Sequence, residues 1–197
     1  TGTIGVGIDL DQALGSVGIS TQNTYRHVYI GTSTHAVRFS TSGAVNNELH
    51  TFDHVVITGN GTTGYLLQGC QSKQHRIIGG SIGSRTTGIN FAPGSAQIFG
   101  VNFSGNTTDI AIGAACDQIG IYGAQSEGAQ KFLTTGAGSC NAKNVTISGG
   151  RFTLQSGVSP YISHTGSGTL SISGGDFADG AHLPGLTVVQ EAGIGTC

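Results

Sequence analysis

Carboxylates are scarce in this sequence, and a few of them stand where they could perform acid–base chemistry. Asp9 and Asp11 lie two residues apart, so on a β-strand both side chains would project from the same face. Two carboxyl groups roughly 5 to 9.5 Å apart can hydrolyse a glycosidic bond, one as acid and one as base or nucleophile. Asp109 and Glu127 are two further carboxylates. We predict these four residues as candidate catalytic groups.

A second set of side chains is suited to holding a sugar. Aromatic rings stack on the C–H face of a pyranose, while arginine and amide groups bind hydroxyls or carboxylates. The predicted substrate-binding residues are Tyr29, His54, Arg76 and Gln97. The competing interpretation is an ordinary solvated sheet face that happens to carry one tyrosine.

The cysteines and histidines give no pattern typical of a metal site. The four cysteines are Cys70, Cys116, Cys140 and Cys197, and no Cys-X-X-Cys spacing occurs among them. We therefore predict no metal and no cofactor. Cys116 and Cys140 fall at nearly equivalent places in adjacent repeats, so they could form a disulfide or two stacked buried thiols.

The elements that must position these residues recur with a period near twenty residues. Ile98 follows Ile77 by 21 positions (98 − 77), and Ile110 follows Ile89 by the same 21 (110 − 89). Strand-like segments at such a fixed period predict a solenoid of about eight turns. The expected core column is Ile8, Ile30, Ile57, Ile77, Ile98, Ile121, Ile147 and Ile172. Glycine recurs two places later, at Gly59, Gly79, Gly100, Gly123, Gly149 and Gly174, where the chain would turn a corner.

Residues on either side of this column should form outward rows. The row one place later contains Ile78, Phe99 and Tyr122, and an exposed apolar strip marks a contact surface. We predict a subunit interface there; a covering loop and a sugar-stacking platform are the alternatives. The row one place earlier would align Tyr29 with Arg76 and Gln97.

Two carboxylates also have a structural interpretation in this register. Asp109 would meet Lys131 of the next turn in a surface ion pair, which contributes only about 0 to 1 kcal/mol. Arg151 and Asp176 likewise occupy equivalent positions in neighbouring turns.

Composition supports a stacked β structure and excludes several classes of function. Charged residues are 9% of the 197 residues and glycine supplies 35, so small polar residues must cover the surface. Eight Lys and Arg residues with a net charge of −2 do not make the basic stripe that nucleic acid requires. No apolar run is long enough to cross a bilayer. We predict one domain over residues 1–197, and, because methionine is absent, a piece of a longer chain.

The repeated isoleucine, glycine and aromatic columns resemble those of right-handed parallel β-helices of the pectate-lyase and phage-tailspike kind. The resemblance implies an all-β fold, a single-stranded right-handed parallel β-helix. It also implies a virion-associated or extracellular homotrimer that binds, and in some cases depolymerises, a cell-surface polysaccharide. A secreted monomeric polysaccharide lyase or glycoside hydrolase is one alternative, and a structural stalk or adhesin repeat without catalysis is another.

Overall fold

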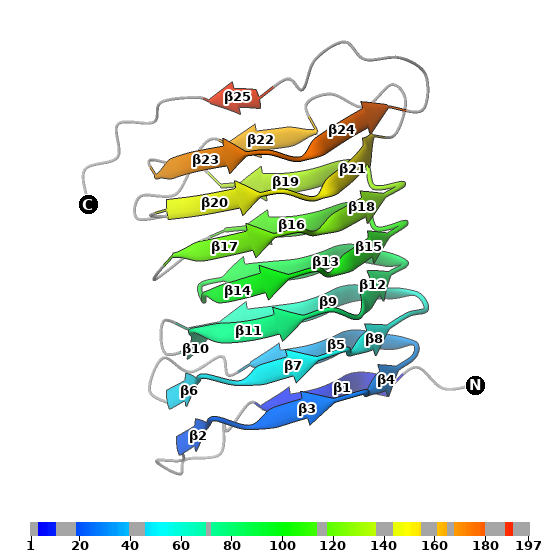
Figure 1. The fold of residues 1–197 in the computed structure, drawn as a ribbon. Coiled ribbons are helices and arrows are strands. Elements are labelled where there is room, and N and C mark those ends of the chain that lie inside the picture. The colour runs from blue at the N-terminus through cyan, green and yellow to red at the C-terminus, as the bar shows by residue number, and fades with distance from the viewer. Residues whose placement is uncertain are drawn as a thin grey trace.

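The computed structural model is an all-β solenoid in which the chain rises in right-handed turns (Figure 1). The structure describes residues 4–10, 19–39, 46–69, 72–113, 118–136, 144–154, 161–164, 168–179 and 188–190. All strand pairs in these ranges are parallel, and no helix occurs in them. The predicted fold class is therefore confirmed. Within the same ranges, no helix is long and apolar enough to span a membrane.

Three long sheets and one short sheet form the walls of the solenoid. Sheet A contains β1 (Ile4–Leu10), β5 (Ser33–Phe39), β9 (Gly61–Gln68), β13 (Arg85–Ala92), β16 (Thr108–Ile112), β19 (Lys131–Thr135), β22 (Ile162–His164) and β25 (Val188–Gln190). Sheet B contains β2 (Ile19–Thr21), β6 (Asn46–Glu48) and β10 (Ser72–Lys73). Sheet C contains β3 (Thr24–Arg26), β7 (Thr51–Asp53), β11 (His75–Ile78), β14 (Ala96–Phe99), β17 (Ile119–Tyr122), β20 (Asn144–Ser148) and β23 (Thr169–Ser173). Sheet D contains β4 (Tyr29–Ile30), β8 (Val56–Ile57), β12 (Ser81–Gly83), β15 (Asn102–Ser104), β18 (Gln125–Glu127), β21 (Arg151–Leu154) and β24 (Asp176–Asp179).

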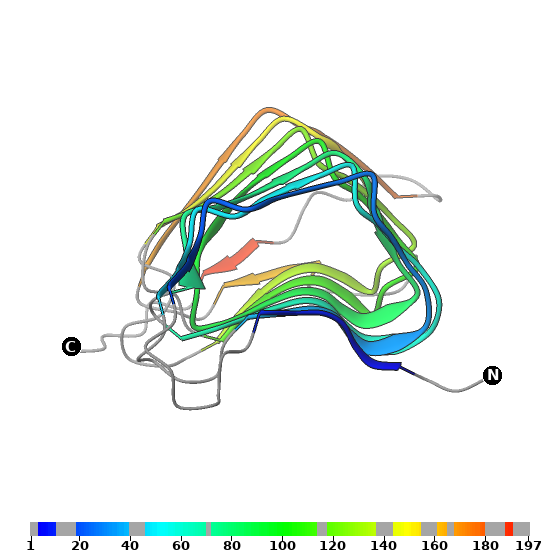
Figure 2. The ribbon, with the colours of Figure 1, turned by 90° about the horizontal axis from the view of Figure 1, so that it is seen from below.

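Viewed along the axis, sheets C and D lie on one side of the core and the bent strands of sheet A lie on the other (Figure 2). The strands of each described turn pair with the strands of the turns directly above and below, as in other solenoids. Side chains of equivalent strands therefore stack into rows parallel to the axis. These rows, rather than sequence neighbours, determine which residues can act together.

The predicted isoleucine column is confirmed in the middle of the chain, but the prediction is wrong near the start. Five isoleucines of sheet C do stack in register: Ile77, Ile98, Ile121, Ile147 and Ile172. Ile30 and Ile57 instead pair in sheet D, where they continue into Ile82. Ile8 pairs with Val37 in sheet A.

The error arises because buried isoleucines occupy more than one wall of the same turn. Ile77 and Ile82 are only five positions apart (82 − 77), and both are buried. The true predecessors of Ile77 in sheet C are the aromatic residues Phe52 and Tyr25. In the first turns the buried column of sheet C is aromatic instead of isoleucine. An alignment that followed isoleucine alone therefore left sheet C at this point and continued with the isoleucines of sheet D.

The corner between sheets C and D begins with a residue of left-handed backbone in every described turn. Its members have φ between 52° and 66°: His27, His54, Gly79, Gly100, Gly123, Gly149 and Gly174. Glycine adopts this conformation without the steric penalty that a Cβ brings. The predicted glycine corner is confirmed for the five later turns, whereas Gly59 belongs to the bend that follows sheet D.

Several polar residues are enclosed within the solenoid, among them a histidine held neutral. The backbone N–H of His50 donates to Nδ1 of His75 (3.2 Å), so the proton of His75 is on Nε2, which lies 3.1 Å from Ser72 Oγ. Phe39 packs against the same imidazole, with ring centres 4.3 Å apart. Burial lowers the pKa of His75 to about 3, because the charged ring would lose its water and the His50 hydrogen bond.

Candidate functional site

A groove of about 310 Å³ crosses the outer face of sheet C near its entry corner. It is lined by Leu49, Gln74, Arg76, Ser95, Gln97 and Gln118. Arg76 and Gln97 are register partners on β11 and β14, as the sequence predicted, and both line the groove. The lining thus combines one guanidinium with three primary amides and a hydroxyl. Such groups can bind several hydroxyls or a carboxylate at once.

Two of the lining residues have a backbone conformation that glycine would adopt more easily. Leu49 and Gln74 have φ of 60° and 58°, and Leu49 remains 40% exposed. A non-glycine residue in this region costs roughly 1 kcal/mol or more, and a leucine gains nothing from solvent exposure. Strained residues of this kind concentrate at functional sites. Both strained residues lie in the lining of the groove.

The apolar row beside the groove is present and faces outward, as predicted. Ile78, Phe99 and Tyr122 are register partners in consecutive turns. Phe99 is 38% exposed and stacks on Tyr122, with ring centres 5.1 Å apart and planes 16° apart. A Cβ on Gly120 would lie 2.1 Å from Gln97 Oε1 and 2.6 Å from the Tyr122 hydroxyl oxygen. Glycine at this position therefore allows the amide and the phenol to lie close together over its backbone.

Two predicted substrate-binding residues lie elsewhere. Tyr29 is 70% exposed but stands on sheet D, in the row of Val56 and Ser81, so its expected alignment with Arg76 is wrong. His54 occupies the corner between sheets C and D, outside the groove lining. The structure thus brings together only Arg76 and Gln97 from that predicted set.

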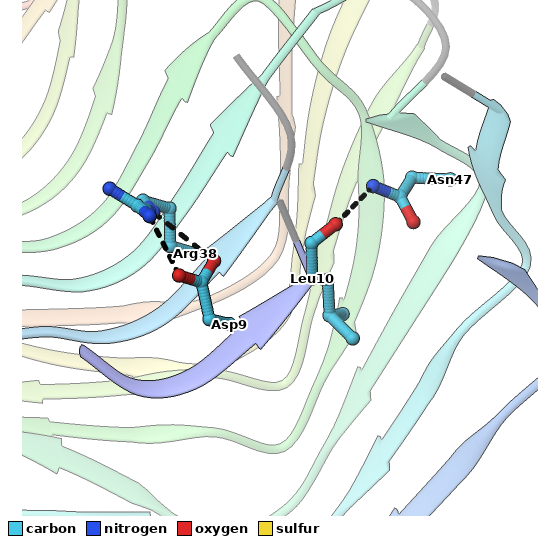
Figure 3. A network of polar contacts seen from close by, with 4 residues as sticks. All are labelled: Asp9, Leu10, Arg38 and Asn47. Atoms are coloured by element: carbon cyan, nitrogen blue, oxygen red, sulfur yellow. Dashed lines mark hydrogen bonds and ion pairs between the residues drawn. The ribbon is translucent and has the colours of Figure 1, made fainter. Parts of the chain in front are cut away.

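Asp9, the first candidate catalytic carboxylate, is engaged in an ion pair. Arg38 of the next turn donates to it through Nε (3.2 Å) and Nη2 (2.7 Å), as Figure 3 shows. Nearby, Asn47 Nδ2 donates to the carbonyl of Leu10 (2.8 Å; Figure 3). Asp11 lies outside the described residues, as do all four cysteines, so a carboxylate pair and a disulfide both stay predictions.

Asp109 is fully buried, and the predicted surface ion pair with Lys131 is wrong. Lys131 is the register partner of Thr108, whereas Asp109 points into the core. Its Oδ1 accepts from Asn106 Nδ2 (2.9 Å), and its Oδ2 contacts the Ser126 hydroxyl, which in turn lies 2.5 Å from Tyr161 Oη. Burial raises the pKa of Asp109 to about 7. An enclosed carboxyl of this kind does not meet a polymeric substrate.

Glu127 is the remaining candidate, and it is exposed on the outer face of sheet D. It lines a smaller groove of about 120 Å³ together with Asn102, Gln125, Ser126, Arg151 and Thr153. Arg151 pairs in register with Asp176, as the sequence predicted. Among the described lining residues of both grooves, Glu127 is the only carboxylate.

Sequence reasoning overlooked Leu49, Ser95 and Gln118, and it did not select Gln74 as a binding residue. These residues lie at or beside corners, one or two places before strands of sheet C. The sequence signal for these residues was a non-glycine residue at a position where the chain must bend. It was not recognised, because the register predicted for the first turns was wrong.

Together, the strand topology and the grooves define a right-handed parallel β-solenoid with a polar groove on each of two adjacent walls. Comparison with protein-family models, with curated proteins and with solved structures gives no significant match. Function must therefore be argued from the site.

Replacing Leu49 with glycine is expected to stabilise the fold by about 1 kcal/mol, because it relieves the left-handed strain at an exposed position. Urea unfolding of the two proteins measures this difference. Gly100→Leu, at a corner with the same φ of 60°, is the reverse control and should destabilise by a similar amount. A Leu49→Gly protein that is less stable than wild type would contradict the assignment of strain.

Proposed function

We propose that this chain is an extracellular, polysaccharide-binding β-solenoid and that the sheet C groove is its binding site. The observation that carries the proposal is the combination of Arg76 and the groove amides with a stacked, outward aromatic pair beside them. Carbohydrate recognition needs these two elements together: hydrogen-bonding groups for hydroxyls and a ring face for the C–H surface.

The dimensions of the groove favour a short stretch of polymer. A volume of about 310 Å³ is at the lower end of ligand sites, and the groove lies on a wall, not within a closed cavity. A chain bound there could continue over the solenoid in both directions. Successive turns could then add weak contacts along its length.

Binding is better supported than cleavage. Glycoside hydrolysis needs two carboxyl groups about 5 to 9.5 Å apart, and the described residues of the grooves supply one, Glu127. Asp9 is paired with Arg38, and Asp109 is buried. A depolymerase would need a further group from a part of the chain or a partner outside these surfaces.

A trimer on a virion remains part of the proposal, with the apolar row at the subunit boundary. Ile78, Phe99 and Tyr122 make a narrow strip, whereas a stable interface buries about 800 Å² on each partner. The interface would therefore extend onto the polar flanks, and the groove would lie at its edge. Sedimentation distinguishes this assembly from a monomeric binder.

The test is a binding panel of bacterial capsular polysaccharides, O-antigens and plant pectins. Arg76→Ala and Phe99→Ala should each weaken binding to the best ligand by about tenfold, the value of one good contact. The matched control is Arg151→Ala, an exposed arginine of sheet D, which should retain binding within about twofold.

Product analysis in the same reactions addresses catalysis. A lyase would release reducing ends and an unsaturated sugar that absorbs ultraviolet light, whereas a hydrolase would release reducing ends alone. Equal affinities for wild type, Arg76→Ala and Phe99→Ala would refute the sheet C groove as the site.

A further inference from the structure

The sheet C groove extends over four consecutive turns of the solenoid. On the sheet itself, four residues pair in register from turn to turn: Thr51, Arg76, Gln97 and Gly120. Two places earlier in each turn, at the corner, stand Leu49, Gln74, Ser95 and Gln118. Neighbouring strands lie about 4.8 Å apart, so side chains follow one another along the solenoid axis at this spacing. A polymer that runs along the axis can therefore meet several of them at once.

Arg76 is the one charged residue in the lining of this groove, and it is exposed. Within the described part of the chain, its guanidinium forms no ion pair and no hydrogen bond. Three other cations of the early turns each meet a carboxylate: Arg26 with Asp53 (3.1 Å), Arg38 with Asp9 (2.7 Å) and Lys73 with Glu48 (3.4 Å). Arg76 is thus a cation in a groove whose lining has no carboxylate.

The charges next to the groove in sequence already compensate each other. Glu48 precedes Leu49, and Lys73 precedes Gln74. The two are register partners on β6 and β10, and their side chains are only 20% and 35% exposed. The charge that a ligand meets in the groove is therefore that of Arg76.

An uncompensated guanidinium selects between acidic and neutral ligands. A ligand that covers Arg76 displaces its water, which costs free energy unless a new partner replaces that water. A carboxylate accepts two parallel N–H bonds from the planar guanidinium and cancels its charge, whereas a hydroxyl leaves the charge uncompensated. The neighbouring amides of Gln74 and Gln97 both donate and accept, so they suit the hydroxyls of the same sugar chain.

We propose that the ligand of the sheet C groove is an acidic polysaccharide, with the carboxylate of a uronic acid bound by Arg76. The inference rests on the proposed function and adds the chemical class of the polymer. Since one guanidinium serves the groove, one carboxylate per bound segment satisfies it. The groove amides then hold the hydroxyls of the adjoining sugars.

The experiment compares each polymer with its own neutral form. The probes are polygalacturonate, alginate, hyaluronan and glucuronate-containing capsular polysaccharides, each native and after reduction of its carboxyl groups to alcohols. Calorimetric titration of the intact chain measures both affinities. The native form of the polymer that binds best should bind at least about tenfold more tightly than its reduced form, because one charge-assisted pair is lost.

Arg76→Gln tests which residue makes this distinction. Glutamine keeps hydrogen-bonding groups but removes the charge, so the variant should bind the native and reduced polymers within about twofold of each other. Arg151→Gln is the matched control, since it removes the same charge from an exposed position on sheet D. The control should keep the full preference of wild type for the native polymer.

The outcomes separate this inference from the proposed function. Equal binding of native and reduced polymers by wild type would overturn the acidic class and leave a polysaccharide site. Arg76→Gln that keeps the wild-type preference, or Arg151→Gln that loses it, would overturn the assignment to Arg76. A wild-type protein that binds neither form of any polymer, nor the wider panel, would refute the proposed function and this inference with it.

Discussion

Asp109→Asn is expected to be more stable than wild type above pH 7, by up to about 4 kcal/mol, and nearly equal to it at pH 4. The pKa of Asp109 is raised from 3.8 to about 7 in the fold, so the native state holds a proton that the unfolded chain releases. The stabilisation is fully present below about pH 4 and is lost as pH rises to about 7. Three pH units at about 1.4 kcal/mol each give the expected size.

The surroundings of Asp109 suit a neutral amide. The oxygen of an asparagine could accept from Asn106 Nδ2, and its NH₂ group could donate to the Ser126 hydroxyl. Ser126 could then donate to Tyr161 Oη. Every hydrogen bond of the buried cluster would survive without a charge in the core.

Urea unfolding at pH 4, 6 and 8 measures the effect, with the exposed Glu127→Gln as control. The control should change stability by less than about 0.5 kcal/mol at each pH. His75 contributes to stability with the opposite pH dependence: because its pKa is lowered in the fold, the protein loses stability as pH falls from 6.5 towards 3. This loss should remain in the Asp109→Asn variant, where the buried carboxyl no longer titrates. A difference between Asp109→Asn and wild type that is the same at pH 4 and 8 would rule out titration of the buried carboxyl.

Arg85→Ala is expected to destabilise the protein by about 3 to 5 kcal/mol. Arg85 is 2% exposed and crosses the corner after sheet D, where its guanidinium donates to three backbone carbonyls: Ser33 O (2.5 Å), Gly31 O (2.8 Å) and Thr58 O (2.9 Å). Alanine would leave these acceptors without that donor, and each buried unsatisfied group costs about 1 to 3 kcal/mol. Gly61 makes the arrangement possible, since a Cβ there would lie 2.0 Å from Arg85 Nη1.

Arg76→Ala is the matched control, because that arginine is exposed and lies on sheet C of the same turn, nine residues earlier (85 − 76). It should alter stability by less than about 0.5 kcal/mol. Arg85→Lys should recover part of the loss, since an ammonium can reach fewer of the three carbonyls than the planar guanidinium. The free energy of unfolding from urea titration is the measurement, and an Arg85→Ala loss below about 1 kcal/mol would contradict the role of Arg85 as a corner clamp.

The amino-acid sequence by itself determined the fold class and the middle of the register. Between Ile77 and Ile121 the turns are 21 and 23 residues long (98 − 77 and 121 − 98), and their isoleucine, glycine and aromatic columns repeat in phase. That regularity is sufficient to place Arg76 beside Gln97 and Phe99 beside Tyr122. The alternation of hydrophobic residues along a strand depends only on residues close together in the chain, so it can be recognised from the sequence alone.

Only the tertiary structure decided which residues of the first turns share a wall and which polar groups are enclosed. Ile57 and Ile77 are equally hydrophobic, and backbone pairing alone assigns them to sheets D and C. Asp109 and Arg85 look like surface charges in the sequence, but both are buried in the fold, and the absence of a Cβ at Gly61 leaves room for the guanidinium of Arg85. The pairing of His27 with His54 likewise depends on stacking between turns, since contacts between residues distant in sequence are set by the packed chain and not by local pattern.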